Sequence, residues 1–568
     1  MNNSRTTSRF AKRFATGLGV VILASSVAIP AGGAKQVPSA AVKHNLTIMI
    51  GEPNAGWCNQ DSPGIDQVAA KNAVLETLTI KNDKGKIVPY LAREFSGSAD
   101  KTQWTVRLRE GIYFTDGEEL TADTMQMNFL ALNGMIQGVT KQLYGKAMGQ
   151  AGSLPAIAWL DQMGVNSKSG AAVIGAAWAK FFKKLDKYTF LITLAKPDPN
   201  WPYRLWAEGR TTVMSTKALL DPNCGTTVVV GTGPFKIKSK GIDQNTTVLE
   251  ANPKYWRSTA TNPLPKAQEV TFKTVGDAAQ RVNALRSGQA DIATFGSTSG
   301  VQLNLLKTLK SKITLVAGAQ EVTWNAHLNT TSLPFKSKNA REAFAYAFDG
   351  ETYVKVMTKG NAIAAHSIAP SVHPYYVPNQ SLKFNLAKAK ASAAAYKTET
   401  GKDLEIVIPI TTTVESLKGA QLMCKFMAAA GISCTTMSPV TSSQYILRGF
   451  GLQQQMSVFN VAAGNSASFT NLFSTPTDLE LSGFRFTNPT LATCFDTARQ
   501  TDTAAAYKPC VTELQANSFW VPMYTESGFI AYRNEVKGIG ATPLLGGGLR
   551  PVVGPTGFDF ASATKPAN

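Results

Sequence analysis

Residues 322–349 read VTWNAHLNTTSLPFKSKNAREAFAYAFD and join a short strand pattern to a longer helical one. The first part is rich in β-branched and aromatic residues and ends at a turn that contains Pro334, which is typical of a β-strand. In the second part, apolar residues recur at helical spacing and form one stripe: Ala340, Ala343, Phe344, Ala347 and Phe348. Ser337 or Asn339 is expected to cap this helix by accepting a hydrogen bond from a free backbone N–H. The stretch therefore predicts a strand that leads directly into an amphipathic helix.

The first 34 residues have the features of a secretion signal. A basic start precedes a mostly apolar run at 15–29, and small residues at 31–34 suit signal peptidase. The apolar run is too short and too poor in large side chains for a comfortable membrane span, although a retained anchor is the alternative. We therefore expect an exported protein, periplasmic or extracellular and associated with the cell envelope.

Length and charge limit the possible architectures and partners. The chain has 568 residues, whereas a single hydrophobic core stops growing at about 250–300 residues, so two or more lobes are expected. The formal net charge is +19, which fits a solvated basic surface or attraction to anionic wall polymer, lipid or ligands. Lysine and arginine are scattered and no nucleic-acid-binding module is present, so nucleic acid is not an expected partner.

Six cysteines in an exported chain indicate disulfides. Local proximity favours Cys494 with Cys510 and Cys424 with Cys434, which leaves Cys58 and Cys224 as a long-range pair. Fifteen connectivities remain possible for six cysteines. The four histidines are not spaced with the cysteines like a metal site, so neither a metal nor another cofactor is expected: His44, His327, His366 and His373.

Several further segments carry recognisable motifs. Residues 91–129 read LAREFSGSADKTQWTVRLREGIYFTDGEELTADTMQMNF, in which alternating Trp104, Val106 and Leu108 predict a half-buried strand. GTGPFKIK at 231–238, ANPKYW at 251–256, VTFKTVGDAAQRVNALRSGQADIA at 270–293 and ANSFWVPMYTESGFIAYRNEVKGI at 516–539 follow in order. Together with the stretch at 322–349, these segments resemble the peptide-binding family (family 5) of solute receptors for ABC importers.

The resemblance implies an α/β, two-lobed periplasmic-binding-protein-like fold of class II, cluster C type, with an extra subdomain in lobe one and a hinge between the lobes. On the family pattern, lobe I spans 35–320 with the extra subdomain at about 81–190, lobe II spans 321–518, and 519–568 return to lobe I. The implied function is a monomeric, non-enzymatic receptor that captures a peptide-like or other small solute and delivers it to the membrane subunits of an ABC permease.

Five residues are candidates to line the ligand cleft. Trp57 follows the first strand, at the position where loops of an α/β lobe often face a cleft. Trp324 and Asn325 are neighbours on one strand and are expected to point to opposite faces. Trp520 lies near the place where the return strand crosses the cleft in the family. Asn465 stands near the position where peptide-binding relatives carry an aspartate for the ligand's ammonium group, so a free peptide amine would be held less firmly here.

Two other function classes compete with the transport receptor. An exported hydrolase acting on peptides or wall material would need a dispersed catalytic site, because no G-x-S-x-G, H-E-x-x-H or P-loop motif is present. Gly231 and Gly233 lack the third glycine and the following helix of a dinucleotide-binding loop. A receptor fold used for sensing or adhesion is the other alternative, and the sequence barely separates it from transport.

Overall fold

The fold was taken from a computed structural model of the chain. The structure describes residues 44–52, 57–58, 65–132, 171–206, 209, 211–226, 228–238, 245–318, 322–373, 376–378, 381–441, 444–445, 448–449, 453–462, 489–550 and 558–566. The expected signal at 1–34, the middle of the expected extra subdomain and Asn465 lie outside these residues. Among the helices that are described, none combines the length and the apolar character needed to cross a membrane.

A seven-stranded mixed sheet forms one core of the molecule. Its strand order is β12-β19-β11-β1-β10-β9-β8, and β1 pairs in parallel with both β10 and β11. The strands are β1 (Asn45–Ile50), β8 (Phe235–Ile237), β9 (Thr246–Ala251), β10 (Glu269–Thr274), β11 (Ile292–Phe295), β12 (Ile313–Ala317) and β19 (Phe529–Arg533). Helices α8 (Ala278–Ser287) and α9 (Gly300–Thr308) share one buried apolar cluster with β11, and α1 (Ile65–Val74) shares another with β1 and β10.

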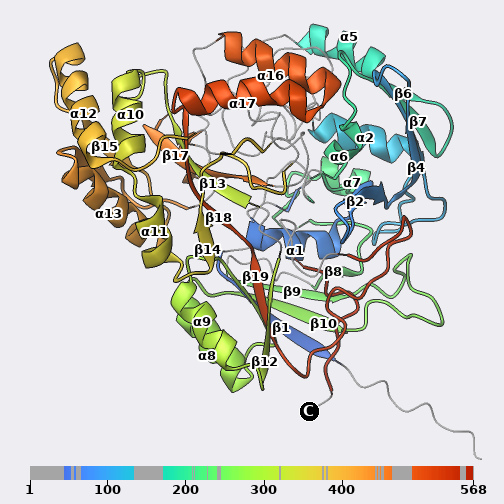
Figure 1. Ribbon diagram of the computed structural model, residues 1–568. Helices are drawn as coiled ribbons and strands as arrows, with labels where there is room; N and C mark the ends of the chain where they lie inside the picture. The colour runs from blue at the N-terminus through green and yellow to red at the C-terminus, as the bar shows by residue number, and fades with distance from the viewer. Residues whose placement is uncertain are drawn as a thin grey trace, which may run out of the picture. The chain divides into compact units, whose positions relative to one another are not determined.

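A four-stranded antiparallel sheet, here called the central sheet, forms a second core (Figure 1). Its order is β14-β18-β13-β17, with bounds β13 (Val322–Leu328), β14 (Ala362–Ala364), β17 (Met456–Ala462) and β18 (Trp520–Glu526). One buried cluster joins its strands to α10 (Lys338–Ala347), α11 (Gly350–Met357), α12 (Leu386–Thr400) and α13 (Val414–Ala429). The parallel pair β15 (Glu405–Ile408) and β16 (Ser433–Thr436) contributes to the same cluster. A separate cluster joins the sheet to α16 (Pro489–Thr501) and α17 (Ala504–Ala516).

A third sheet has the order β4-β5-β7-β6, and a two-stranded sheet β2-β3 precedes it in the chain. The bounds are β2 (Thr79–Lys81), β3 (Ile87–Pro89), β4 (Ala92–Gly97), β5 (Gln103–Leu108), β6 (Phe182–Lys184) and β7 (Thr189–Thr193). As the alternation predicted, Trp104, Val106 and Leu108 of β5 are buried. The helices in this part of the chain are α2 (Ala122–Leu132), α5 (Ala171–Phe181), α6 (Trp201–Arg204) and α7 (Thr216–Leu220).

The strand and helix expected at 322–349 are both present, as β13 and α10. Ser337 is the helix cap, since its Oγ accepts a hydrogen bond from Ala340 N at 3.4 Å. Asn339 instead donates to the Glu399 carboxylate of α12 at 2.9 Å. Ser337 Oγ also donates to Glu399 at 2.6 Å, so the start of α10 is tied to α12 as well as capped.

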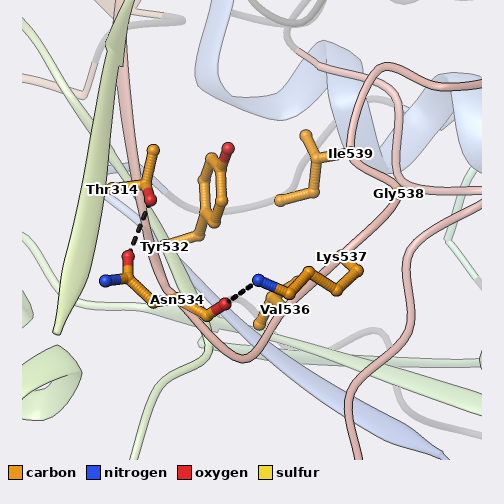
Figure 2. A pocket seen from close by; sticks show the side chains of 7 residues that line it. All are labelled: Thr314, Tyr532, Asn534, Val536, Lys537, Gly538 and Ile539. Carbon is orange, nitrogen blue, oxygen red and sulfur yellow. Dashed lines mark hydrogen bonds between the residues drawn. The ribbon is translucent and has the colours of Figure 1, made fainter.

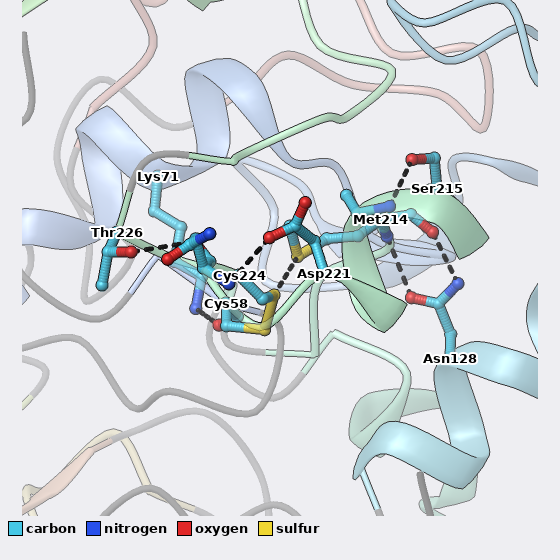
Figure 3. Close-up of a disulfide and its surroundings, with 10 residues drawn as sticks. Cys58, Lys71, Asn128, Met214, Ser215, Asp221, Cys224 and Thr226 are labelled. Carbon is cyan, nitrogen blue, oxygen red and sulfur yellow. Dashed lines mark hydrogen bonds between the residues drawn. A yellow bond between two sulfur atoms is a disulfide. The ribbon is translucent and has the colours of Figure 1, made fainter. Parts of the chain in front are cut away.

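Three disulfides join Cys58 with Cys224, Cys424 with Cys434, and Cys494 with Cys510, the pairing that proximity along the chain favoured. The first holds the segment after β1 against the segment after α7 (Figure 3). Next to it the buried Lys71 of α1 donates from Nζ to the Cys58 carbonyl at 2.8 Å. The bridge and the lysine together fix the backbone at Cys58.

The two glycines of GTGPFKIK serve close packing. A Cβ on Gly231 would lie 2.0 Å from the Val74 carbonyl oxygen, and one on Gly233 would lie 2.5 Å from the Ala73 oxygen. Gly233 N donates to Val74 O at 3.0 Å. The segment therefore lies against the C-terminal end of α1, which only residues without a side chain allow.

Candidate functional site

The chain passes twice, side by side, between the seven-stranded sheet and the central sheet. On the outward pass β12 leads to β13, and on the return β18 leads to β19. β12 pairs antiparallel with β19 up to Ala317 and Phe529, and β13 pairs antiparallel with β18 from Val322 and Glu526. Between the two ladders Gly318 N donates to Gly528 O at 2.9 Å. The two sheets are thus joined by a paired connection, with a glycine in each of its segments.

A β-bulge in the pairing of β13 with β18 decides which side chains share a face. The register shifts between Trp324 and Asn325, so that Trp324 pairs with Tyr524 while Asn325 pairs with Pro522. In a regular strand, Trp520 and Tyr524 would lie on the same face, because side chains alternate with a period of two. The extra residue at the bulge moves Tyr524 to the opposite face, where it packs in the cluster of α10 to α13.

On the face of the central sheet that α10 to α13 cover, three stacked aromatic rings lie next to the buried carboxylate of Glu526. Trp324 is stacked on Tyr524 with 6.2 Å between ring centroids, and Tyr524 is stacked on Tyr353 of α11 at 5.8 Å. Trp324 Nε1 donates to Oε1 of Glu526. Burial, followed by the charge of Glu526 and the neighbouring Tyr353, raises the pKa of Tyr524 well above its usual value. The tyrosine therefore stays neutral beside the carboxylate.

Glu526 also reaches the seven-stranded sheet. Its Oε2 accepts a hydrogen bond from Ser297 N at 3.0 Å and a second from Ser297 Oγ. Ser297 follows β11 and is fully buried, and Glu526 is 8% exposed. The carboxylate of Glu526, at the end of β18, thus accepts hydrogen bonds from Trp324 of the central sheet and from Ser297, which follows β11 of the seven-stranded sheet.

The opposite face of the central sheet carries Asn325, His327 and Trp520. His327 is stacked on Trp520 with 3.6 Å between ring centroids. Asn325 Nδ2 donates to Thr323 O and Ile368 O, each at 3.0 Å. Burial lowers the pKa of His327 well below its usual range, so the imidazole is neutral at pH 7. This face is polar at its centre, yet every one of these side chains is buried.

The structure brings together three of the five candidate lining residues. Trp324, Asn325 and Trp520 lie on adjacent paired strands, with Trp324 half-buried on one face and the other two buried on the opposite face. The expected opposite orientation of Trp324 and Asn325 is therefore present. Trp57 is 2% exposed and packs in the cluster of the seven-stranded sheet. Asn465 lies outside the described residues.

Sequence reasoning missed Glu526, Ser297 and His327 as members of this region. For Glu526 a signal was present: it is the one carboxylate of the otherwise uncharged segment 516–528, just before Gly528. Nothing in the local pattern around Ser297 connects it with a residue 229 positions later.

Two hollows lie elsewhere on the described surface. One, of about 340 Å³, lies beside the ends of β12 and β19 (Figure 2). Its polar groups already bond to one another: Thr314 Oγ1 donates to Asn534 Oδ1 at 2.7 Å, and Lys537 Nζ donates to Asn534 O at 2.5 Å. The other, of about 690 Å³, is open and is lined by Asn304 of α9 and by residues of α11 and the turn that follows it. In the described part of the chain, no three His, Cys, Asp or Glu side chains are grouped as metal ligands.

The sequence matches one family model over residues 86–479, more than half of the chain, and the model is described as "Bacterial extracellular solute-binding proteins, family 5 Middle". A nickel-binding periplasmic protein of Escherichia coli K12 is 26% identical over 360 residues, which cover 62% of this chain and 61% of that protein. The glutathione-binding protein GsiB of Salmonella typhimurium is 25% identical over 377 residues, 66% of this chain and 64% of that protein. The match therefore spans less than two thirds of the length of either relative.

Solved structures with the same fold cover nearly the whole chain. The periplasmic binding protein DppA of Helicobacter pylori, in complex with the peptide STSA, has a TM-score of 0.74 at 18% identity and covers 92% of this chain and 98% of its own. The binding protein AgaA of A. tumefacien R10, in complex with agropinic acid, has a TM-score of 0.74 at 19% identity, with coverage of 92% and 99%. The fold class predicted from the sequence is confirmed.

Proposed function

Because the chain belongs to family 5 of the bacterial extracellular solute-binding proteins, we propose that it is the receptor of an ABC importer. It captures a small solute between two lobes and delivers it to the membrane permease. Lobe I comprises residues 35–320 and the return at 519–568, and lobe II comprises residues 321–518. The receptor is exported, acts as a monomer and catalyses no reaction.

The observation that carries this proposal is the paired connection between the two sheets. Two adjacent segments that each contain a glycine, Gly318 and Gly528, bend with little steric resistance because glycine accepts a wide range of backbone angles. The ladders on either side of them remain intact during such a bend. This is the geometry of hinge closure, in which a ligand shifts the balance toward the closed form by its higher affinity for that form.

We assign the face of the central sheet that carries Asn325 and Trp520 to the wall contributed by lobe II, where both side chains are buried and Trp520 packs with α16 and α17. The other face is filled by the helices α10 to α13. Trp324 belongs mainly to that filled face, so we assign it to the hinge. Trp57 is 2% exposed and packs in the cluster of the seven-stranded sheet, so we assign it to the support behind the wall contributed by lobe I. Binding in the micromolar range requires about 8 kcal/mol, which aromatic surface, amides and bridging waters in a closed cleft supply.

The proposed ligand is a peptide-like or other small solute. Relatives named for binding nickel, glutathione and murein peptide, and structures with a peptide and with agropinic acid, support this chemical range. Asn465, in place of a carboxylate, favours solutes that do not depend on a free ammonium group. The strongly basic chain favours solutes that carry a negative charge.

Native mass spectrometry of freshly purified protein tests the proposal by identifying any solute that co-purifies. Thermal unfolding with dipeptides, N-acetylated dipeptides, nickel-histidine and opine-type acids then ranks the ligand classes, because binding to the native state raises the melting temperature. Asn465→Asp is expected to increase affinity for dipeptides with a free amine and not for their acetylated forms. Asn223→Asp, in an exposed loop, is the matched control. If no class of solute shifts the melting temperature at millimolar concentration, the receptor function is refuted.

A further inference from the structure

Three guanidinium groups gather around one buried tyrosine, Tyr90, between β3 and β4. Arg109 Nε donates to the Tyr90 carbonyl at 2.7 Å. The Arg257 guanidinium lies 5.4 Å from the centre of the Tyr90 ring, with its Nη1 3.4 Å from the Tyr90 hydroxyl. The Arg550 guanidinium lies 5.9 Å from the same ring. Arg93, on the adjacent β4, is exposed, and the four residues are called the arginine cluster below.

The cluster is built on a fixed base. Beneath it the buried carboxylate of Glu76 accepts four hydrogen bonds, from the hydroxyls of Tyr90, Tyr255 and Thr232 and from the indole of Trp256, at 2.7 to 2.9 Å. All four donors are neutral, and together they occupy the oxygens of Glu76. Their bonds hold the Tyr90 ring in place, so the guanidinium groups around it have a rigid support.

The positive charge of the cluster exceeds the negative charge next to it. Within the described residues, Arg550 forms an ion pair with Asp559 at 3.7 Å, and no carboxylate pairs with Arg93, Arg109 or Arg257. At Tyr90, the charges of Arg109, Arg257 and Arg550 thus outnumber the buried carboxylates of Glu76 and Asp559.

The surroundings of Arg109 disfavour its positive charge. Partial burial, followed by the positive charges of Arg257 and Arg93, lowers its pKa. Its Nη atoms have no hydrogen-bond partner in the part of the chain that the structure describes. A half-buried guanidinium that faces two like charges gains energy from an anion placed among them.

We propose that Arg93, Arg109 and Arg257 form a binding site for a phosphate or phosphodiester group. Guanidinium groups bind phosphate oxygens through paired N–H donors, and a phosphate anion offsets the surplus of positive charge. The site is distinct in its residues from the proposed solute cleft and does not depend on the transport function. Two sources supply this chemistry outside the cytoplasm: free inorganic phosphate, and an anionic polymer with phosphodiester links.

Isothermal titration calorimetry of the full chain with inorganic phosphate and, separately, with short-chain poly(glycerol phosphate), whose links are phosphodiesters, tests the site. Arg93→Gln is the first variant, because Arg93 is exposed and carries no described bond that the fold needs; Arg257→Gln is the second. Arg107→Gln is the matched control, since Arg107 lies on β5, two residues before Arg109, and is half-buried like it, but forms ion pairs with Glu94 and Glu110. The same low-salt buffer serves all titrations, because screening weakens exposed charges.

We expect each cluster variant to lower the affinity for phosphate at least fivefold and the Arg107 control to lower it less than twofold. If only inorganic phosphate binds, the free anion is the source; if poly(glycerol phosphate) binds more tightly than inorganic phosphate, the phosphodiester polymer is the source. The site is refuted if neither probe binds, or if Arg107→Gln weakens binding as much as the cluster variants do. Solute-induced shifts in melting temperature are measured on the same variants, so failure of this site is distinguished from failure of the receptor function.

Discussion

Replacing Glu526 by glutamine is expected to lower the free energy of unfolding by about 3 kcal/mol. From the residues that the structure describes, the carboxylate accepts three hydrogen bonds, two from Ser297 and one from the indole of Trp324, in an almost fully buried position. Glutamine keeps one acceptor oxygen and replaces the other with an NH2 group, which cannot accept from these donors. A buried donor left without an acceptor costs about 1–3 kcal/mol, and the bonds that remain lose the strength that the charge gave them.

Urea unfolding followed by tryptophan fluorescence measures the loss. Glu250→Gln is the control, because Glu250 forms an exposed ion pair with Lys236 at 2.9 Å and such pairs contribute about 0–1 kcal/mol. Trp324→Phe removes a single donor and is expected to cost about 1–2 kcal/mol. The double variant completes a cycle, and because the two side chains are bonded, the two losses are expected not to add.

The reasoning is refuted if Glu526→Gln unfolds at the same urea concentration as the Glu250 control, or if the losses from Glu526→Gln and Trp324→Phe add within about 0.3 kcal/mol. The first result would mean that the carboxylate does not hold the two sheets together, and the second would mean that it is not coupled to Trp324. If Glu526→Gln lowers the free energy of unfolding and this loss adds fully to that of Trp324→Phe, the effect of Glu526 comes from its hydrogen bonds to Ser297 alone.

Three other variants probe the packing around the two sheets. Because burial lowers the pKa of His327 in the folded state, unfolding takes up a proton below about pH 6.5, so stability is expected to fall by about 2 kcal/mol from pH 7 to pH 5. His327→Phe, measured by urea unfolding at both pH values, is expected to remove this part of the pH dependence; an unchanged dependence would contradict it. Gly231→Ala is expected to cost more than about 2 kcal/mol, since its Cβ would lie 2.0 Å from a backbone oxygen, whereas Gly276→Ala, with its nearest atom at 3.8 Å, is expected to cost less than 1 kcal/mol. If Gly231→Ala and Gly276→Ala lowered the free energy of unfolding equally, the backbone near Gly231 would be able to move away from the added Cβ without cost. Replacing Cys58 and Cys224 by serine frees a loop closed over 166 residues and is expected to cost about 5 kcal/mol by chain entropy, so an unfolding midpoint equal to that of the unmodified protein would refute the contribution of the bridge.

Local chemistry made much of the secondary structure predictable. The alternation of Trp104, Val106 and Leu108 produced a strand, and the apolar spacing after Ser337 produced a helix that begins at that cap. These features depend on residues within a few positions of one another, so the chain pattern is sufficient to specify them. Proximity along the chain likewise favoured the disulfide between Cys424 and Cys434, which are 10 residues apart.

The candidate site was predictable only in part. The family resemblance placed Trp324 and Trp520 on the two strands that cross between the lobes, and these strands are paired, as β13 and β18. Alternation along one strand was enough to separate Trp324 from Asn325. The bulge that turns Tyr524 onto the face of Trp324 has no signature in the local sequence, because it arises from pairing with another strand. The burial of Trp57 was equally hidden, since the residues that cover it come from distant parts of the chain.

By itself, the sequence determined the succession of strands and helices, the motifs shared with family 5 and the strong excess of positive charge. Only the tertiary structure decided that Glu526 bonds to Ser297, and that Arg257 and Arg550 lie against the ring of Tyr90. The physical reason is the range of the interactions. Hydrophobic periodicity and helix capping act between residues a few positions apart, whereas a buried carboxylate or guanidinium takes whichever partners the folded chain brings within about 3 Å.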